Sequence, residues 1–337
     1  HHQKLSALLA VGILLLPATQ YPATTWWSKP DLDREYVLSL DVEHYFGNIQ
    51  KMRKHLETDR QILWVTYYRN LYNATHPSEI NSPVSLSRNL LAWNQPGTNG
   101  LILPVNPSAS FLSILFANEL WFTLGDMTMA EHCAMLSMIF SPRNSGSRMI
   151  KRLAEINLVN GDDEAALKYL RILDKTLLHK SWAEKRIPGQ QTPRVKEWLE
   201  KKRRDIPTQD QLRSGNDAVT SLQNLVASNA GNLRAYEYLL CYHLLSKDLR
   251  SFVDDYVPGK VSSPIFAEAL LIHLARQGNI RAEELIKYQI PVEIAKEFTD
   301  YTRLYEAKDT SLKEKYGQTY WFYYHFATTE PGKESKP

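Results

Sequence analysis

The sequence predicts an all-α fold, an α-solenoid of antiparallel helix pairs, and three observations support this prediction. Apolar residues recur with helical spacing along most of the chain. Helix-breaking residues separate these runs at similar intervals: Gly161 follows Gly125 after 36 positions, and Gly278 follows Ser246 after 32. No stretch shows the alternation of a half-buried strand. Helix pairs that recur at such a period stack along one direction, so that each pair buries its apolar side on its neighbours.

The clearest helix pair spans Ala154 to Leu178. Its first helix is expected to end at Asn160-Gly161, because glycine accepts the left-handed conformation at a helix end. Asp162 or Asp163 can cap the second helix, where acids complement the helix dipole. One side of this second helix is expected to carry Ala166, Leu167, Leu170, Leu173, Leu177 and Leu178.

The same reasoning divides the rest of the chain into helices and loops. Helices are predicted over residues 31–46, 49–56, 59–71, 84–93, 109–124, 127–140, 145–159, 194–204, 217–226, 233–245, 249–257, 264–277, 281–288 and 291–307. Residues 73–82 and 94–107 are predicted to be loops. The predicted organisation is a membrane-proximal segment and linker over residues 1–30, a helical-repeat domain over 31–326 and a disordered tail over 327–337.

The N-terminal region contains an uncharged apolar run from Leu5 to Leu16. Twelve helical residues extend about 18 Å, whereas the core of a bilayer is about 30 Å thick. Three interpretations remain open: the end of a membrane span, a signal-peptide core after Lys4, and a buried helix. Trp26 and Trp27 follow, and amphipathic aromatic residues favour the membrane interface, so both are candidate lipid or partner contacts.

Composition indicates a globular protein and excludes several functional classes. The chain of 337 residues is 43% hydrophobic with a net charge of +3, which does not suggest a nucleic-acid partner. Its two cysteines, Cys133 and Cys241, lie in apolar helical contexts and are expected to be buried free thiols. The histidines lack metal-ligand spacing, and common nucleotide and hydrolase motifs are absent. We therefore expect no catalysis, no metal and no cofactor.

Four basic residues form the clearest charge cluster, on the helix predicted over residues 194–204: Lys201, Lys202, Arg203 and Arg204. One interpretation is contact with anionic lipid headgroups or with a partner. The other is a solvated helix face whose cations lie near the helix C-terminus, where the dipole favours them.

Two further features are candidates for binding. Asp254-Asp255 lies late in its predicted helix, where acids are unfavourable, so this pair is a candidate partner contact. The run from Tyr316 to Phe326 is rich in aromatic residues. It can stack on a sugar or nucleic acid, or it can be a capping helix that covers the apolar face of the last repeat.

Two resemblances extend this interpretation. The helix pair around Gly161 resembles a degenerate tetratricopeptide-type repeat, with Ala166 at the small position of the second helix and Leu170 at the large apolar position. The segment from Arg148 to Arg186 also resembles an uncharacterised bacterial family of polytopic membrane proteins, and the likeness extends over most of residues 31–324. This resemblance implies that residues 5–16 end the last membrane span and that a membrane half precedes them. The family has no established activity, so it implies no catalytic residues.

The main functional expectation is a membrane-tethered helical-repeat scaffold that binds a protein or peptide on its concave face. One alternative is a regulatory or substrate-presenting soluble half of a membrane enzyme that acts on glycans or lipid-linked sugars. A second alternative is a carbohydrate-binding helical domain, which a deep acidic and aromatic pocket would favour. The position of Lys4 before the apolar run places the soluble part outside the cytoplasm, at the bacterial inner membrane and in the periplasm.

Overall fold

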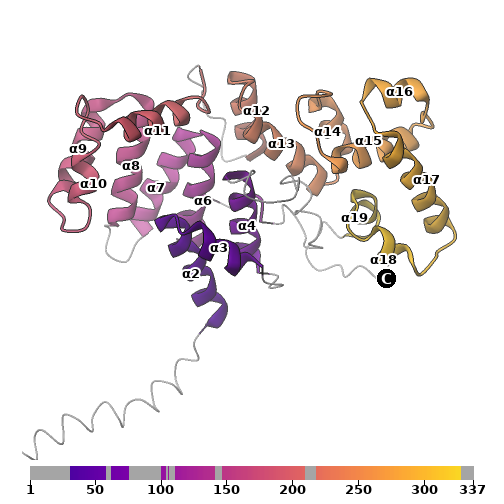
Figure 1. Cartoon of the computed structure of the whole chain (residues 1–337), viewed down its shortest axis with the longest axis horizontal. Coiled ribbons are helices and arrows are strands. Elements are labelled where there is room, and N and C mark those ends of the chain that lie inside the picture. The colour runs from indigo at the N-terminus through magenta and orange to yellow at the C-terminus, as the bar shows by residue number, and fades with distance from the viewer. Residues whose placement is uncertain are drawn as a thin grey trace, which may run out of the picture. The chain divides into compact units, whose positions relative to one another are not determined.

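The computed structural model describes residues 31–57, 62–75, 100–103, 105, 111–140, 146–208 and 218–327. These residues form seventeen helices and no strand, so the predicted all-α class is confirmed for this part of the chain (Figure 1). The chain divides into two compact units, residues 1–65 and residues 66–337. The apolar run 5–16, Trp26, Trp27, the predicted helix 84–93 and the tail after Ala327 lie outside the described residues.

The first unit contains a helix pair, α2 (Leu32–Phe46) and α3 (Ile49–Leu56). Asp31 caps α2, because its carboxylate accepts a hydrogen bond of 3.0 Å from the backbone N–H of Arg34. Gly47 ends α2 in the left-handed conformation, as predicted. The two helices pack on each other, and their buried apolar residues are Val37, Leu40, Met52 and Leu56.

The second unit contains the remaining helices, and α4 (Leu63–Thr75) enters it from the first unit. The next helices are α6 (Phe111–Leu124), α7 (Met127–Phe140), α8 (Ser147–Asn160), α9 (Asp163–Asp174), α10 (Lys180–Glu184) and α11 (Pro193–Arg203). They are followed by α12 (Ala218–Ser228), α13 (Leu233–Leu245), α14 (Leu249–Asp255), α15 (Pro264–Arg276), α16 (Ala282–Lys287), α17 (Val292–Glu306), α18 (Leu312–Tyr316) and α19 (Tyr320–Phe326).

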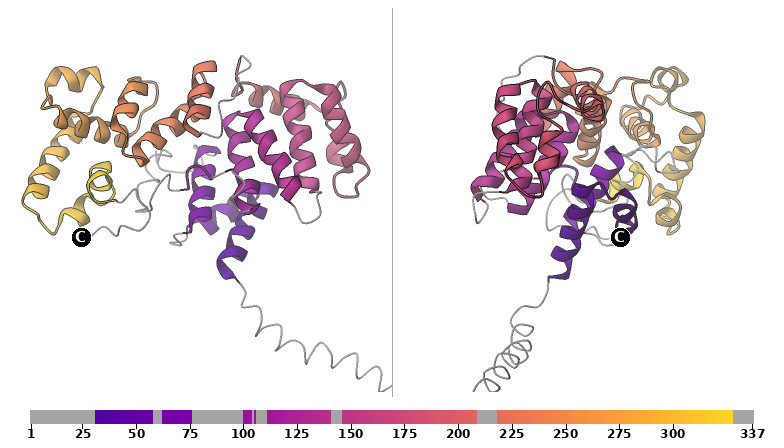
Figure 2. Two further views of the ribbon diagram at one scale, coloured as in Figure 1. Left: turned by 180° about the vertical axis from the view of Figure 1, so that it is seen from behind. Right: turned by 60° about the vertical axis from the view of Figure 1, so that its left-hand side comes forward.

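Helices α6 to α9 lie side by side in chain order, with neighbouring helices running in opposite directions (Figures 1 and 2). Helix α6 is apolar on all sides, and all but three of its residues are buried. Gly161 ends α8 with φ +81°, and the carboxylate of Asp162 accepts from Ala165 N at 2.9 Å to start α9. Left-handed glycines also stand at the predicted turns Gly125 and Gly278, whereas at Ser246 the left-handed residue is the following Lys247.

The largest errors in the predicted helix boundaries concern α9 and α4, and α14 also ends at Asp255 rather than at residue 257. Helix α9 ends at Asp174, so Leu177 and Leu178 are not part of its apolar side and are 97% and 85% exposed. The reason is Thr176, whose hydroxyl donates to Leu173 O at 2.7 Å and accepts from His179 N at 3.2 Å, which turns the chain. Helix α4 continues to Thr75, so residues 73–75 are helical and not part of a loop.

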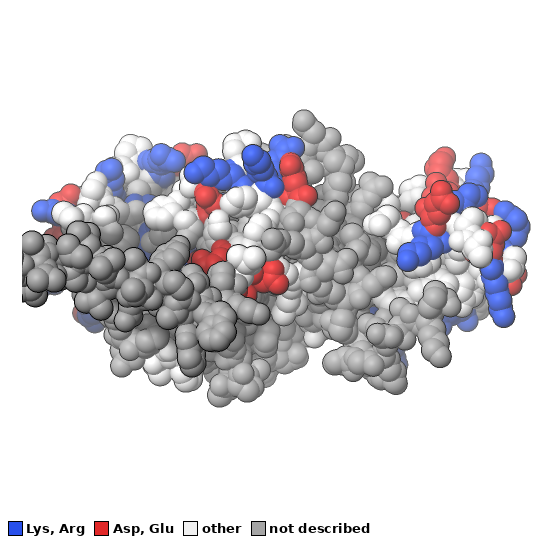
Figure 3. Space-filling model, turned by 90° about the horizontal axis from the view of Figure 1, so that it is seen from below, with Lys and Arg blue, Asp and Glu red and all other residues white. Residues whose placement is uncertain are grey.

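Charged side chains of both signs lie on the face of the molecule drawn in Figure 3. On the face drawn in Figure 3, basic and acidic side chains lie next to one another and do not separate into regions of one sign. This distribution agrees with the small net charge of +3, so a binding site that uses charge is expected to be a local cluster of charged side chains.

Candidate binding site

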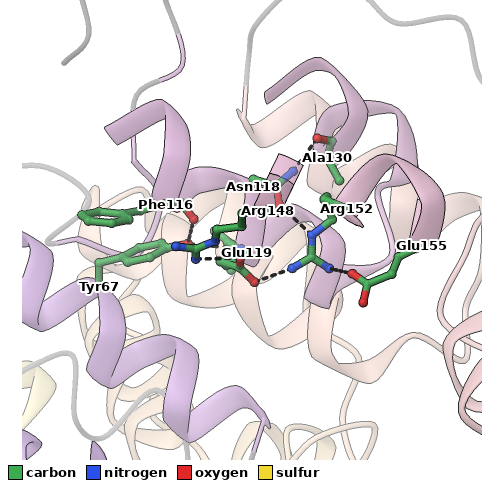
Figure 4. Close-up of polar contacts among 9 residues, drawn as sticks. Tyr67, Phe116, Asn118, Glu119, Ala130, Arg148, Arg152 and Glu155 are labelled. Carbon is green, nitrogen blue, oxygen red and sulfur yellow. Dashed lines mark hydrogen bonds and ion pairs between the residues drawn. The ribbon is translucent and has the colours of Figure 1, made fainter. Parts of the chain in front are cut away.

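The candidate site is a surface where α6, α8, α10 and α11 bring basic and aromatic side chains together. We call it the cation–aromatic surface and define it by Phe122, Lys151, Arg152, Trp182, Arg186, Trp198 and Lys202. It adjoins a network of paired charges between α6 and α8 (Figure 4).

Glu119 is the centre of the charge network. It lies in the apolar helix α6 with its side chain 7% exposed, and it accepts from two arginines of α8. Its two carboxylate oxygens bind different partners, at 3.0 Å from Arg148 Nη2 and 2.6 Å from Arg152 Nη2. The arginines are four residues apart and therefore share one face of α8. A buried carboxylate with two charge-assisted hydrogen bonds holds the two helices in register.

Arg152 has all its nitrogens engaged. Its Nε donates to Asn118 Oδ1 at 2.8 Å, and its Nη1 lies 3.0 Å from Glu155 Oε2. Asn118 in turn donates to the carbonyl of Ala130 in α7 at 2.6 Å. The guanidinium carbon lies 3.8 Å from the ring centroid of Phe122, a cation–π contact. The planar guanidinium thus links three helices through these contacts (Figure 4), and it also covers the ring of Phe122.

Tyr67 of α4 braces α6 beside this network. Its hydroxyl donates to Phe116 O at 2.5 Å and accepts from Leu120 N at 3.1 Å, so it joins two backbone groups one helical turn apart. Burial raises the pKa of Tyr67 well above its usual value, and the nearby Glu119 adds to this effect. The hydroxyl therefore stays protonated and acts as a structural donor.

Lys202 of α11 also contacts the ring of Phe122. Its ammonium nitrogen is 4.6 Å from the centroid of the Phe122 ring, and Trp198, one helical turn earlier, stacks on the same ring at 6.2 Å. Burial, together with the positive charges of Arg152 and Arg234, lowers the pKa of Lys202 to about 8. The site thus holds a half-buried amine among other cations.

The C-terminal end of α6 is fastened from α13. Arg234 donates to Thr123 O at 3.0 Å and pairs with Asp205 at 3.2 Å, and Asn232 donates to Leu124 O at 2.7 Å. These donors satisfy carbonyl groups that a helix end leaves without partners. The next residue, Gly125, has φ +91°, and a Cβ there would lie 2.3 Å from the carbonyl oxygen of Asp205. Only glycine allows this close approach.

A second cation–aromatic group adjoins the first through α8. Lys151 Nζ lies 5.1 Å and the Arg186 guanidinium carbon 4.1 Å from the ring of Trp182, which is half-buried. Burial lowers the pKa of both Lys151 and Arg186. Half-buried tryptophans covered by cations offer flat apolar area together with charge.

The structure separates the four basic residues predicted as one cluster. Lys201 and Arg204 are exposed, whereas Lys202 packs against Phe122. Arg203 donates to Val159 O at 3.0 Å and Leu158 O at 2.7 Å, so it caps the C-terminus of α8. Adjacent helical residues point about 100° apart, so the four side chains do not form one face.

The adjacent acids Asp254 and Asp255 also have different environments. Asp255 Oδ2 lies 2.8 Å from Nε2 of the buried His243 in α13, whereas Asp254 is exposed and 4.0 Å from Arg250. The unfavourable position of Asp255 at a helix end is thus offset by a tertiary hydrogen bond, which the sequence alone did not show.

The C-terminal aromatic run lies mostly in the core. Tyr320 and Tyr323 donate to the last carbonyl groups of α13, Leu244 O at 3.0 Å and Leu245 O at 2.7 Å. Trp321 is fully buried and donates to Glu268 O at 3.0 Å. These three side chains therefore form a capping contact and do not provide a stacking platform for a sugar.

A cavity of about 140 Å³ lies beside the start of α15. Tyr256, Tyr288 and Gln289 line it together with small and apolar residues, and no acidic residue is among them. It therefore lacks the acidic groups that would favour the carbohydrate-binding alternative.

Sequence reasoning missed the charged centre of the site. Glu119 and the preceding Asn118 are the strongest polar residues in an otherwise apolar helix, and such an interruption signals a buried polar contact. Arg148, Arg152 and Glu155 at helical spacing were the matching signal on α8.

Other features of the described part of the chain that bear on function are its thiols, its metal-ligating side chains and the length and polarity of its helices. Cys133 and Cys241 are buried free thiols, as predicted, and burial raises the pKa of Cys241 well above its usual value. No group of metal-ligating side chains was found within the described ranges. No helix among the described residues combines the length and apolar character that crossing a bilayer requires.

The model of a family of unknown function (DUF6057) matches residues 3–327. No curated protein and no solved structure matches the chain.

Proposed function

We propose that this chain, which belongs to a family of unknown function (DUF6057), is a non-catalytic helical scaffold that binds a partner protein or an extended peptide. Its helices act in this proposal as an α-solenoid of degenerate tetratricopeptide-like pairs. The partner lies along the cation–aromatic surface.

One observation carries this proposal: the cation–aromatic surface combines the residue types that dominate protein interfaces. Trp182 and Trp198 are half-buried, and Arg186 stacks on the first of them at 4.1 Å. Tryptophan and arginine are enriched among the residues that contribute most binding energy. Tryptophan buries a large area with only two rotatable bonds to fix, and the planar guanidinium of arginine stacks on aromatic rings and donates several hydrogen bonds. The Glu119 network holds α6 and α8 together beneath this surface, so the surface is preorganised.

Site-specific photocrosslinking in the native host tests the proposal. A benzoylphenylalanine placed at Trp182 or at Trp198 should form a discrete adduct with another protein. The same group at exposed Lys313 of α18 is the control and should form none. Both target positions already hold large aromatic residues, so the substitution keeps their size. No adduct from either tryptophan position would reject this surface as a docking site.

The membrane tether and the periplasmic location are part of the same proposal. They rest on the uncharged apolar run from Leu5 to Leu16 and the tryptophans that follow it. Alkaline phosphatase fused after Pro337 in the intact gene should be active, because this enzyme folds only after export. An inactive fusion, with fluorescence from a reporter that folds only in the cytoplasm, would reverse the orientation.

A further inference from the structure

Lys202 differs from Arg148, Arg152 and Arg234, because no ion pair joins its ammonium group to a carboxylate among the described residues. Its ammonium group contacts the Phe122 ring at 4.6 Å. These three arginines are each paired, as Arg148–Glu119, Arg152–Glu119, Arg152–Glu155 and Arg234–Asp205.

Counting these groups leaves one uncompensated positive charge. Two cations, Arg152 and Arg234, and two carboxylates, Asp205 and Glu155, act on Lys202, so the positive charge of Lys202 itself is the one left over. The charged groups that act on Lys202 come from each adjoining element: Arg152 and Glu155 from α8, Arg234 from α13 and Asp205 after α11. The cations outweigh the carboxylates in their effect, and burial and repulsion together hold the pKa of Lys202 at about 8. A monoanion beside Lys202 would remove this imbalance.

We propose that Lys202 anchors one carboxylate of an acidic peptide segment, a step that rests on the proposed function. The half-buried amine supplies the charge, and the half-buried ring of Trp198 supplies an apolar wall for the neighbouring side chain of the peptide. A phosphate dianion fits less well, because it would bring a second negative charge that the surface does not balance. The apolar wall likewise favours a peptide over a free anion.

The test uses a short acetylated peptide of alternating glutamate, leucine and glycine, and a matched peptide with glutamine in place of glutamate. Binding to the full chain is followed at pH 7 through the 13C signals of the lysine ε-methylenes. The glutamate peptide should shift the Lys202 signal and raise its pKa, since a nearby carboxylate favours the charged amine. Lys202→Gln should weaken binding about tenfold, as expected for loss of a charged hydrogen bond.

Lys201→Gln is the matched control, because it removes the same charge from an exposed neighbour. It should leave the affinity unchanged, and Lys202→Arg should retain most of it. Equal losses in Lys201→Gln and Lys202→Gln would show diffuse attraction and overturn the proposal. Equal binding of the glutamine peptide would also overturn it.

Two further binding experiments test whether the anion that binds Lys202 is a free phosphate or a lipid headgroup. Inorganic phosphate that shifts the Lys202 signal as strongly as the peptide would assign a free-anion site and overturn the peptide proposal. Phosphatidylglycerol vesicles that bind only through Lys202, without peptide binding, would assign a lipid contact and overturn it as well. Adducts from Trp198 without peptide binding at Lys202 would keep the proposed function and reject this inference. Binding dependent on Lys202 without any adduct would reject the proposed function instead.

Discussion

The carboxylate of Asp255 lies 2.8 Å from Nε2 of His243, and this contact joins the end of α14 to the buried side of α13. The imidazole is 3% exposed, so removal of its partner leaves a buried polar nitrogen. The adjacent Asp254 has no comparable role, because its side chain is 72% exposed and its distance to Arg250 is 4.0 Å.

Asp255→Ala should therefore lower the free energy of unfolding by about 1–3 kcal/mol. Asp254→Ala, the control one residue away, should change it by less than about 0.5 kcal/mol. Urea denaturation followed by far-ultraviolet dichroism measures both. Equal midpoints for the two variants would contradict the proposed importance of the His243 contact.

Gly125→Ala should destabilise the protein more than Gly161→Ala. Both glycines have positive φ, at +91° and +81°, so both substitutions carry the same left-handed penalty of about 1–2 kcal/mol. A Cβ at Gly125 would also meet the Asp205 carbonyl oxygen at 2.3 Å, whereas a Cβ at Gly161 meets nothing within 4 Å. The additional steric cost should be about 1–3 kcal/mol. Thermal unfolding of the two variants measures the difference between their free energies of unfolding. A difference near zero would show that the backbone at Asp205 moves away from residue 125 at no cost.

Glu119→Ala should cost about 3–5 kcal/mol, because two partly buried guanidinium groups lose their shared carboxylate. Glu164→Ala is the control, since that side chain is 90% exposed and pairs with Lys168 only at 3.7 Å. Its effect should be within about 0.5 kcal/mol. Urea denaturation gives the unfolding midpoint of each variant. Similar midpoints for Glu119→Ala and Glu164→Ala would show that the Glu119 network is not needed for stability.

The lowered pKa of Lys202 predicts a pH dependence. In the unfolded chain this amine titrates near 10.5, and in the folded chain at about 8. Between these values the unfolded state binds more protons, so this residue makes the folded state more stable as the pH rises. Below pH 8 the amine is charged in both states, and its burial opposes folding.

Lys202→Met should consequently be more stable than the original protein at pH 7, with an advantage of up to about 3 kcal/mol. That advantage should decrease between pH 8 and pH 10 as the amine loses its charge. Parallel denaturation series at several pH values measure the difference between the two proteins. An advantage that does not change with pH would show that the side chain is not desolvated.

Helix positions could largely be predicted from the sequence, whereas the candidate site could be predicted only in part. The turn between α8 and α9 followed from Asn160-Gly161 and Asp162, because left-handed glycine and carboxylate capping act within a few residues. The exposed turn at Leu177 was missed, because a threonine hydroxyl that ends a helix does not differ in the sequence from one that points to solvent.

The sequence by itself determined the all-α class and most helix boundaries, since apolar periodicity and helix caps are local properties. The environment of each charge was decided only by the tertiary structure. Lys201 and Lys202 are identical and adjacent, yet one is exposed and the other lies on Phe122, which is 80 residues away in the chain. Adjacent positions on a helix face different directions, and the neighbouring helix determines which direction is solvent.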